Sequence, residues 1–183
     1  STGNLLRAAI EAGTKAGLDA KSYMDKGALV PDATVVAVLK DRIAEPDCEA
    51  GFILDGFPRN IAQAQVLEEL GVTIDLVLSI EVPDEEIMER MSGRRVCLKC
   101  GATFHVKNAP SAAGDKCDKC GEALTIRADD KPETVADRLK VFHEQTESLK
   151  TFYGDKGVLT LIHGSGIEGT TKLIMAAIEG SAQ

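Results

Sequence analysis

The sequence predicts an α/β protein with a parallel-sheet core, flanking helices and one small inserted lobe. Short apolar runs at residues 51–55, 75–82 and 158–162 are typical of parallel strands that are buried on both faces. Segments with helical periodicity separate these runs, and two Cys-x-x-Cys-Gly turns interrupt the alternation after residue 96. A chain of 183 residues that is 44% hydrophobic can bury one main core, and the lobe is a satellite that needs a metal to fold.

The first half of the chain predicts three helices and one strand. Capping residues at 1–4 precede the apolar positions of a first helix, and a second helix begins after a turn at residues 26–32. The apolar run 51–55 ends in Asp-Gly-Phe-Pro-Arg, and a third helix follows over residues 62–70. Open α/β sheets bind ligands at the carboxyl ends of their strands, so we expect functional groups in this loop.

The second half predicts two strands, over 75–82 and 158–162, and further helices. A helix starts at Pro132, with apolar positions that follow the 3.6-residue period toward a stop near Gly154, and a last helix covers 168–178. The segment from Gly164 to Thr171 imitates the phosphate-binding pattern GxxxxGK[ST], but Thr170 stands in place of the lysine, which favours an ordinary β-to-α loop. The three histidines form no cluster, and we expect no role for them.

Four cysteines have the spacing C-x2-C-x16-C-x2-C: Cys97, Cys100, Cys117 and Cys120. Four thiolates in two tight turns predict a tetrahedral zinc site, and a closed set of four cysteine ligands makes the metal structural. Two disulfides, or four unrelated core cysteines, are the alternatives. They are disfavoured because the sequence shows no secretory leader and thiols stay reduced in the cytoplasm, which is the expected location.

The charge distribution indicates a compact anionic ligand. The net charge of −8 disfavours non-specific binding to nucleic acid or to an anionic membrane, and no apolar run approaches the roughly 20 residues of a membrane span. Yet every arginine except Arg42 falls in the motifs described here, on both flanks of the cysteine lobe and in the loops of the core. Permanently charged, planar guanidiniums gathered at the hinges of a small lobe suit a lid that closes on polyphosphate.

Four segments together resemble adenylate kinases of the zinc-bearing, long-lid type. These are STGNLLR at residues 1–7, DGFPR at 55–59, GRRVC at 93–97 and LTIRADDKPETVADRL at 124–139. The likeness covers nearly the whole chain from Ser1. It implies a P-loop-kinase-like core of residues 1–95 and 128–183, with a nucleoside-monophosphate-binding region over about 1–45, and a zinc-binding lid of residues 96–127, called the cysteine lobe below.

The resemblance also implies roles for particular residues. The AMP-binding set is Thr2, Arg7, Leu29, Val30, Gly56, Arg59, Gln63, Arg127 and Arg138. The ATP-binding set is Arg90, Arg94, Thr103, Phe104 and Gly166, with Phe104 against the donor adenine. The catalytic set is Arg59, Arg94, Arg127, Arg138 and Asp55, where Asp55 organises water around the Mg²⁺ that accompanies ATP. Gln63 reads the acceptor adenine and Arg59 grips its phosphate.

Adenylate kinases begin with a strand, a glycine-rich phosphate loop and a helix, and this unit has no counterpart in the 183 residues. Its strand lies in the middle of the family's sheet, so an unfilled slot would leave backbone groups buried and unpaired. We therefore expect residues 52–55 and 76–82 to pair directly, with 158–162 on the far side, in a protein that is monomeric. Self-association through an exposed strand edge is the alternative.

The leading functional hypothesis is reversible phosphoryl transfer from Mg-ATP to AMP, which gives two ADP, without a Walker A loop. A nucleotide-binding relic or sensor, with weak or no turnover, is the first alternative. A zinc-ribbon module that binds nucleic acid is the second, and the acidic charge and the 4% aromatic content disfavour it.

Overall fold

The structure of the chain, a computed structural model, describes residues 1–164 and 166–181. The helices of this part are α1 (Thr2–Glu11), α2 (Lys15–Met24), α3 (Asp32–Ile43), α4 (Ile61–Glu69), α5 (Asp84–Gly93), α6 (Pro132–Val141), α7 (Leu149–Asp155) and α8 (Gly166–Ser181). The short helical turns are η1 (Pro46–Cys48), η2 (Ala128–Asp130) and the π turn η3 (Phe142–Thr146). The strands are β1 (Val77–Glu81), β2 (Arg94–Cys97), β3 (Thr103–His105), β4 (Leu124–Thr125) and β5 (Leu159–His163).

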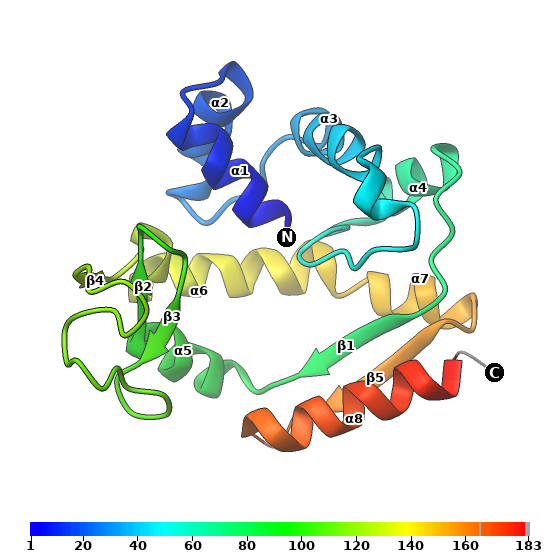
Figure 1. The fold of residues 1–183 in the computed structure, drawn as a ribbon. Coiled ribbons are helices and arrows are strands. Elements are labelled where there is room, and N and C mark those ends of the chain that lie inside the picture. The colour runs from blue at the N-terminus through cyan, green and yellow to red at the C-terminus, as the bar shows by residue number, and fades with distance from the viewer. Residues whose placement is uncertain (165, 182–183) are drawn as a thin grey trace.

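The helices and strands form layers around the long helical rod of α6, η3 and α7. Figure 1 shows α1, α2 and α3 on one side of this rod and the strands β1 and β5, with α8, on the other. The cysteine lobe lies at one end, where α5 leads into β2. The rod therefore faces the N-terminal helices along one side and the sheet along the other.

Two apolar clusters make up the core. The first joins α1 to α4 through buried side chains that include Leu6, Leu39 and Leu67. The second places Ala64 of α4 against Tyr153 of α7, with Val77 and Leu159 of the strands packed beside them. Because α4 contributes to both clusters, the loop that precedes α4 is anchored to both parts of the core.

The main sheet has two parallel strands. β1 pairs with β5 in a continuous register from Val77↔Leu159 to Glu81↔His163. The predicted strands at 75–82 and 158–162 are therefore present, with the α/β class that they imply. The cysteine lobe has its own antiparallel sheet, in the order β3-β2-β4.

The prediction of a three-stranded parallel core is wrong. Residues 51–54 form no strand, β1 lies directly beside β5, and the side chain of Ile53 is 85% exposed. A strand forms only where a neighbour offers a row of backbone donors and acceptors, and in the described part of the chain no strand lies beside 51–54. This segment exposes its backbone to solvent and is not buried, so the predicted closing of the sheet does not occur. The monomeric state and self-association stay predictions.

The long helix predicted from Pro132 is also modified. It runs as α6 to Val141, continues as the π turn and ends as α7. The π turn adds a residue, so the 3.6-residue period used for the prediction shifts after Val141. Phe142, predicted on the apolar stripe, is the first residue of the π turn and is 38% exposed. No helix in residues 1–164 and 166–181 is long and apolar enough to cross a membrane.

The π turn carries a histidine that joins it to α5. The Nδ1 atom of His143 lies 3.0 Å from a carboxylate oxygen of Glu147, and Nε2 lies 2.9 Å from Asp84. Glu147 first, and then Asp84, raise the pKa of His143 above its ordinary value of 6.5. A raised pKa in the folded state stabilises the fold below the unfolded pKa, and this contribution disappears as the pH rises through the folded pKa.

We therefore predict that His143→Gln lowers the free energy of unfolding at about pH 5.5 and has little effect at about pH 8.5. Urea unfolding of both proteins at the two pH values measures this difference. Asp84→Asn, which removes one of the two carboxylates, should shift the same transition toward lower pH. An effect of His143→Gln that is equal at both pH values would contradict the prediction.

Candidate functional site

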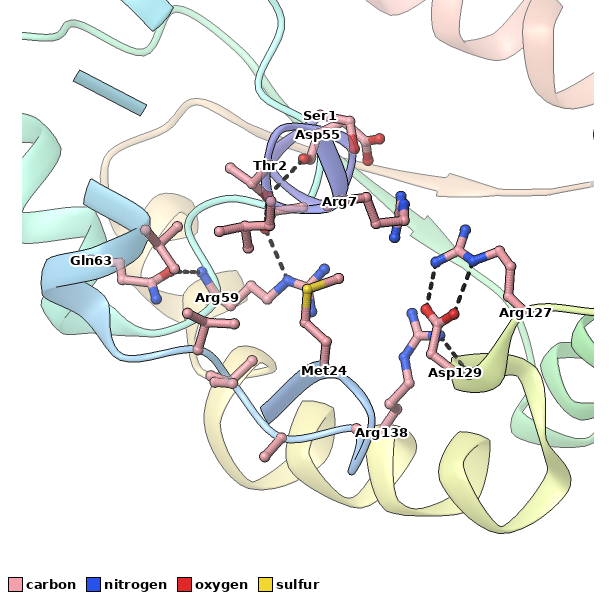
Figure 2. Close-up of a pocket in the computed structure, with 18 of the residues that line it drawn as sticks. Ser1, Thr2, Arg7, Met24, Asp55, Arg59, Gln63, Arg127, Asp129 and Arg138 are labelled. Carbon is pink, nitrogen blue, oxygen red and sulfur yellow. Dashed lines mark hydrogen bonds and ion pairs between the residues drawn. The ribbon is translucent and has the colours of Figure 1, made fainter. Parts of the chain in front are cut away.

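A cavity of about 260 Å³ opens between α1, the loop after α2, the loop before α4 and the start of α6. Five arginines line it: Arg7, Arg59, Arg94, Arg127 and Arg138. Figure 2 shows that the side chains of Arg7, Arg59, Arg127 and Arg138 come from different segments and face a common space. The nine residues of the predicted AMP-binding set all line this cavity, as does the predicted catalytic Asp55.

The loop before α4 is fixed by hydrogen bonds that use several of the predicted site residues. The hydroxyl of Thr2 donates to the carbonyl of Gly56 at 3.0 Å, and Nε of Arg59 donates to the same carbonyl at 2.9 Å. Gln63, which is 1% exposed, accepts a bond from the backbone N–H of Arg59 at 2.7 Å and donates to Asp32 at 2.6 Å. Asp32 thus bonds to Gln63 and to Asn60, and it makes no capping bond for α3. Gln63 supports the loop in addition to lining the cavity.

Gly56 is a position that no other residue fills without strain. Its φ of +74° lies in the left-handed region, and an added Cβ would lie 3.0 Å from Nη2 of Arg59 and 3.4 Å from Oγ1 of Thr2. A side chain at this position would therefore push the Arg59 guanidinium away from the place where it faces the cavity.

The arginines leave the cavity with an excess of positive charge. Burial, together with the neighbouring Arg127, lowers the pKa of Arg7. Burial, together with Arg138, lowers the pKa of Arg59. Arginine stays charged under these conditions, so the lowered pKa values reflect first the cost of burying the guanidiniums and second the repulsion between them. A bound anion with several oxygens would remove this repulsion.

Asp129 is the main counter-charge, and the sequence interpretation did not single it out. Nε of Arg127 donates to Asp129 at 2.9 Å, and Nη1 of Arg138 lies 3.5 Å from its Oδ2. Burial alone would raise the pKa of Asp129, but the Arg127 fork outweighs burial and holds that pKa below its ordinary value. A phosphate that binds Arg127 or Arg138 must therefore compete with this carboxylate. The signal that could have identified Asp129 in the sequence is the Asp129-Asp130 pair, which begins two residues after Arg127.

Arg94 has a structural partner as well as a place in the cavity wall. It forms a two-pronged ion pair with Asp130, in which Nε lies 2.8 Å from Oδ2. The Asp130 side chain is completely buried, whereas that of Arg94 is 21% exposed. Planar guanidinium and carboxylate groups match in this geometry, and the pair joins β2 to the segment before α6.

We predict that Arg94→Ala lowers the free energy of unfolding by about 3–5 kcal/mol, because it leaves a buried carboxylate without its partner. The double variant Arg94→Met with Asp130→Leu should be more stable than Arg94→Ala, since neither charge then remains buried. Urea unfolding of the single and double variants measures both effects. Equal free energies of unfolding for Arg94→Ala and the wild type would show that the Arg94–Asp130 pair does not stabilise the fold.

The predicted ATP-binding residues are not gathered in the same way. Among the described residues, only Arg94 of that set lines the cavity. Arg90 pairs with Glu86 on the exposed side of α5, and Phe104 packs against the cysteine cluster on β3 beside the exposed Thr103. Gly166 is the first residue of α8. The predicted AMP-binding residues are thus gathered at one cavity, while the other predicted ATP-binding residues are spread over three separate elements.

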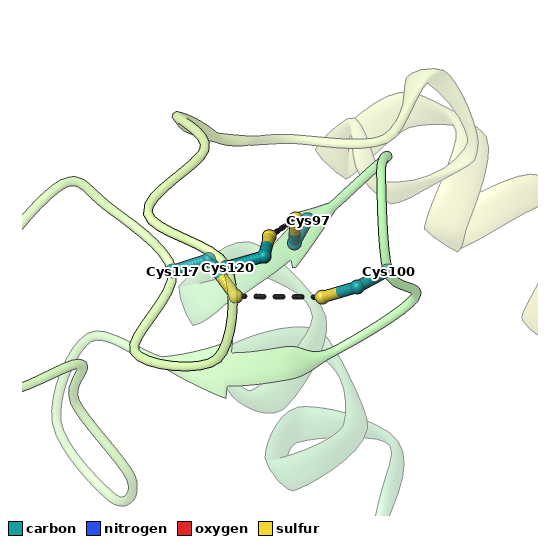
Figure 3. A group of neighbouring side chains, drawn as sticks. All are labelled: Cys97, Cys100, Cys117 and Cys120. Atoms are coloured by element: carbon teal, nitrogen blue, oxygen red, sulfur yellow. Dashed lines mark hydrogen bonds between the residues drawn. The ribbon is translucent and has the colours of Figure 1, made fainter.

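The four predicted metal ligands do come together. The sulfur atoms of Cys97, Cys100, Cys117 and Cys120 all lie within 4.8 Å of one another. Figure 3 shows them projecting from two facing turns, with Cys97 paired to Cys120 at 3.4 Å and Cys100 to Cys117 at 3.5 Å. Four sulfurs about 2.3 Å from one tetrahedral ion lie about 3.8 Å apart, so the cluster has the size of a zinc site.

The electrostatics of the cluster also fit a cation. The backbone N–H of Cys100 is the largest cause that lowers the pKa of Cys97, to about 7. At Cys120 the N–H of Glu122 lowers the pKa, but Cys97 and burial outweigh it and raise the value to about 12. The pKa of Cys120 is thus raised beside Cys97, and a cation between these two sulfurs would favour the thiolate form of both. The donor set could hold a structural zinc ion, and the cysteines are free thiols, so the disulfide alternative is not realised.

His105 has a structural role that the sequence did not suggest. Its Nδ1 accepts bonds from the backbone N–H groups of Lys107 and Asn108, both at 3.1 Å. Its Nε2 is buried against Gly93, where an added Cβ would lie only 2.2 Å from that nitrogen. This close contact joins the end of α5 to β3 at the point where the chain enters the cysteine lobe.

Fold and site together define a class of protein: a parallel α/β protein that gathers arginines around one cavity, beside a lobe in which four cysteines could hold a metal ion. The family model for adenylate kinase matches residues 1–158. An adenylate kinase of Caldicellulosiruptor bescii is 53% identical over 183 residues, which cover 97% of this chain and 85% of that protein. An adenylate kinase of Acetivibrio thermocellus is 51% identical over 185 residues, with coverages of 98% and 85%.

The similarity extends to an archaeal protein, the adenylate kinase of Archaeoglobus fulgidus. It is 49% identical over 184 residues, which cover 98% of this chain and 85% of that protein. The chain belongs to the adenylate kinase family. It is a nucleoside-monophosphate kinase, an ATP:AMP phosphotransferase that uses Mg²⁺ with ATP.

Proposed function

We propose that this chain catalyses reversible phosphoryl transfer from Mg-ATP to AMP, which gives two ADP, with AMP held in the arginine-lined cavity. The observation that carries the proposal is the convergence of five guanidiniums from five separate segments on one cavity. Catalysis of phosphoryl transfer is largely positioning and charge stabilisation, with little covalent chemistry for the protein to perform. Arginines can supply both.

The proposed roles follow from the position of each residue. Arg59 and Arg138 hold the acceptor phosphate from opposite sides, and Arg7 lies beside them on α1. Leu29 and Val30 line the apolar part of the cavity, which suits a base. Arg94 lies two residues before the cysteine lobe and Arg127 is its last residue, and both stabilise the charge that develops on the transferred group. Asp55 would order the water around the Mg²⁺ that accompanies ATP, and this ion would supply positive charge to the donor phosphates.

The chain must do this without a GxxxxGK[ST] loop among its 183 residues. Such a loop supplies backbone N–H groups and a lysine, but no nucleophile and no base. We therefore propose turnover with a raised KM for ATP. Asp129 gives up its pairing with Arg127 and Arg138 when phosphate binds, so the arginines change partner without being left unpaired.

A second candidate function is AMP binding without turnover. It is favoured by the separation of Arg90, Thr103, Phe104 and Gly166 from the cavity among the described residues. The test is formation of ADP from AMP and Mg-ATP by the purified 183-residue chain, with the Arg59→Met variant as the background for a contaminating host kinase. ADP formation above that background supports phosphotransfer. Calorimetric AMP binding by folded protein that forms no ADP would establish the second candidate instead.

A further inference from the structure

The π turn places one hydroxyl against the loop that carries Arg59. Oγ1 of Thr146 donates to the backbone carbonyl of Arg59 at 2.7 Å, across 87 residues of sequence. Thr146 is the last residue of the π turn, which the bond from the N–H of Glu147 to the carbonyl of Phe142 closes at 2.9 Å. The other residues of this turn are exposed, whereas Thr146 is half-buried.

The geometry of the turn decides where this hydroxyl points. An α-helix turns by about 100° per residue, and a π turn contains one residue more than an α-helical turn. Residues after the insertion are therefore rotated around the helix axis relative to a regular continuation of α6. Thr146 lies at the end of the turn, and its hydroxyl points to the Arg59 loop.

The bond from Thr146 completes a clamp on the Arg59 backbone. The backbone N–H of Arg59 donates to Oε1 of Gln63 at 2.7 Å, and the carbonyl of Arg59 accepts from Oγ1 of Thr146. The peptide groups on both sides of the Arg59 Cα are thus fixed, and with them the direction in which the side chain leaves the backbone. Burial first, and then the like charge of Arg138, lower the pKa of Arg59, so Arg138 supplies no attraction that would hold this guanidinium in place.

The same helical rod carries Arg138. It lies on α6, eight residues before Thr146, so the rod positions one phosphate-binding arginine directly and the other through a hydrogen bond. We propose that Thr146 is a positioning residue for the acceptor phosphate: its hydroxyl fixes the distance between Arg59 and Arg138. This inference rests on the function proposed above.

The experiment compares Thr146→Val, which keeps the shape but loses the donor, with Thr146→Ser, which keeps the hydroxyl. Thr151→Val, at an exposed position on α7, is the matched control. For Thr146→Val we expect kcat/KM for AMP to fall about 5- to 10-fold, because one hydrogen bond is lost, and the KM for ATP to change less than about twofold. Thr146→Ser should stay within about twofold of the wild type, and Thr151→Val should match the wild type.

Equal loss toward AMP and ATP in Thr146→Val, or values that match the wild type, would overturn the inference. So would failure of Thr146→Ser to restore AMP recognition. Calorimetric titration with AMP alone separates this inference from the proposed function. If the wild-type chain does not bind AMP, the proposed function and the inference fail together. If the wild type binds AMP and Thr146→Val binds it equally well, only the inference fails.

Discussion

Replacement of Arg59 by Met is expected to lower kcat/KM for AMP by about 10²–10³-fold, the loss seen when one preorganised charge-stabilising donor is removed. Methionine keeps an unbranched, flexible stem and removes the guanidinium with its permanent charge. The affinity for ATP should change much less, because Arg59 lies with Thr2, Gly56 and Gln63 on the acceptor side of the cavity. Steady-state kinetics with each nucleotide varied in turn measure the two effects.

The folded state should tolerate this change. In the described part of the chain no carboxylate forms a salt bridge with Arg59, and its neighbour Arg138 repels it. Its loss therefore leaves no buried charge without a partner, in contrast to the loss of Arg94. The control is Arg42→Met, which removes an exposed arginine paired with Asp47 outside the cavity and should leave the kinetics unchanged. A larger effect of Arg59→Met on ATP than on AMP would refute the assignment of Arg59 to the acceptor phosphate.

Removal of the metal is expected to unfold the cysteine lobe while the core stays folded. The lobe has a small cluster of its own around Cys97, Ala102 and Cys117, with few other apolar side chains. Structural zinc supplies about 10–16 kcal/mol of folding free energy in small domains of this kind, more than such a cluster can replace. Hydrogen exchange followed by mass spectrometry should show peptides from residues 96–127 losing protection after chelation, while α4 and β5 keep theirs.

Turnover should be lost together with the order of the lobe. Arg94 opens β2 and Arg127 follows β4, so both lose their positions when the lobe unfolds. Purified protein should contain one zinc ion per chain. Cys97→Ser should abolish this content, and Cys48→Ser, at the free cysteine outside the cluster, should leave it unchanged. Metal-free protein with a fully protected lobe, or a disulfide between Cys97 and Cys100, would contradict the prediction.

Local signals in the sequence were sufficient for the elements and the cysteine cluster. Apolar runs and helical periodicity placed β1, β5, α4 and α8 within a few residues, because burial on one or both faces determines those patterns directly. The Cys-x-x-Cys-Gly spacing predicted four converging sulfurs, because each pair is held by its own short turn. The arginine-rich motifs identified the family and the residues around the acceptor cavity.

The pairing of strands and the packing of helices could not be derived from the same local signals. The run at 51–55 has the composition of a buried strand, but strand formation depends on a neighbour that local sequence does not specify, and Ile53 is exposed. The π turn depends on how α6 and α7 pack, and a search for a 3.6-residue period does not predict such a turn.

By itself the sequence determined the α/β class, the four converging cysteines, the family and most of the arginines that line the cavity, since these depend on residue types at short spacings. Only the tertiary structure decided that Asp129 and Asp130 pair with arginines of the cavity, that His105 packs on Gly93 and that Thr146 reaches Arg59. The pair between Arg94 and Asp130 spans 36 residues and the bond between Thr146 and Arg59 spans 87. Contacts at such separations follow from how whole elements pack, because no short stretch of sequence contains both partners.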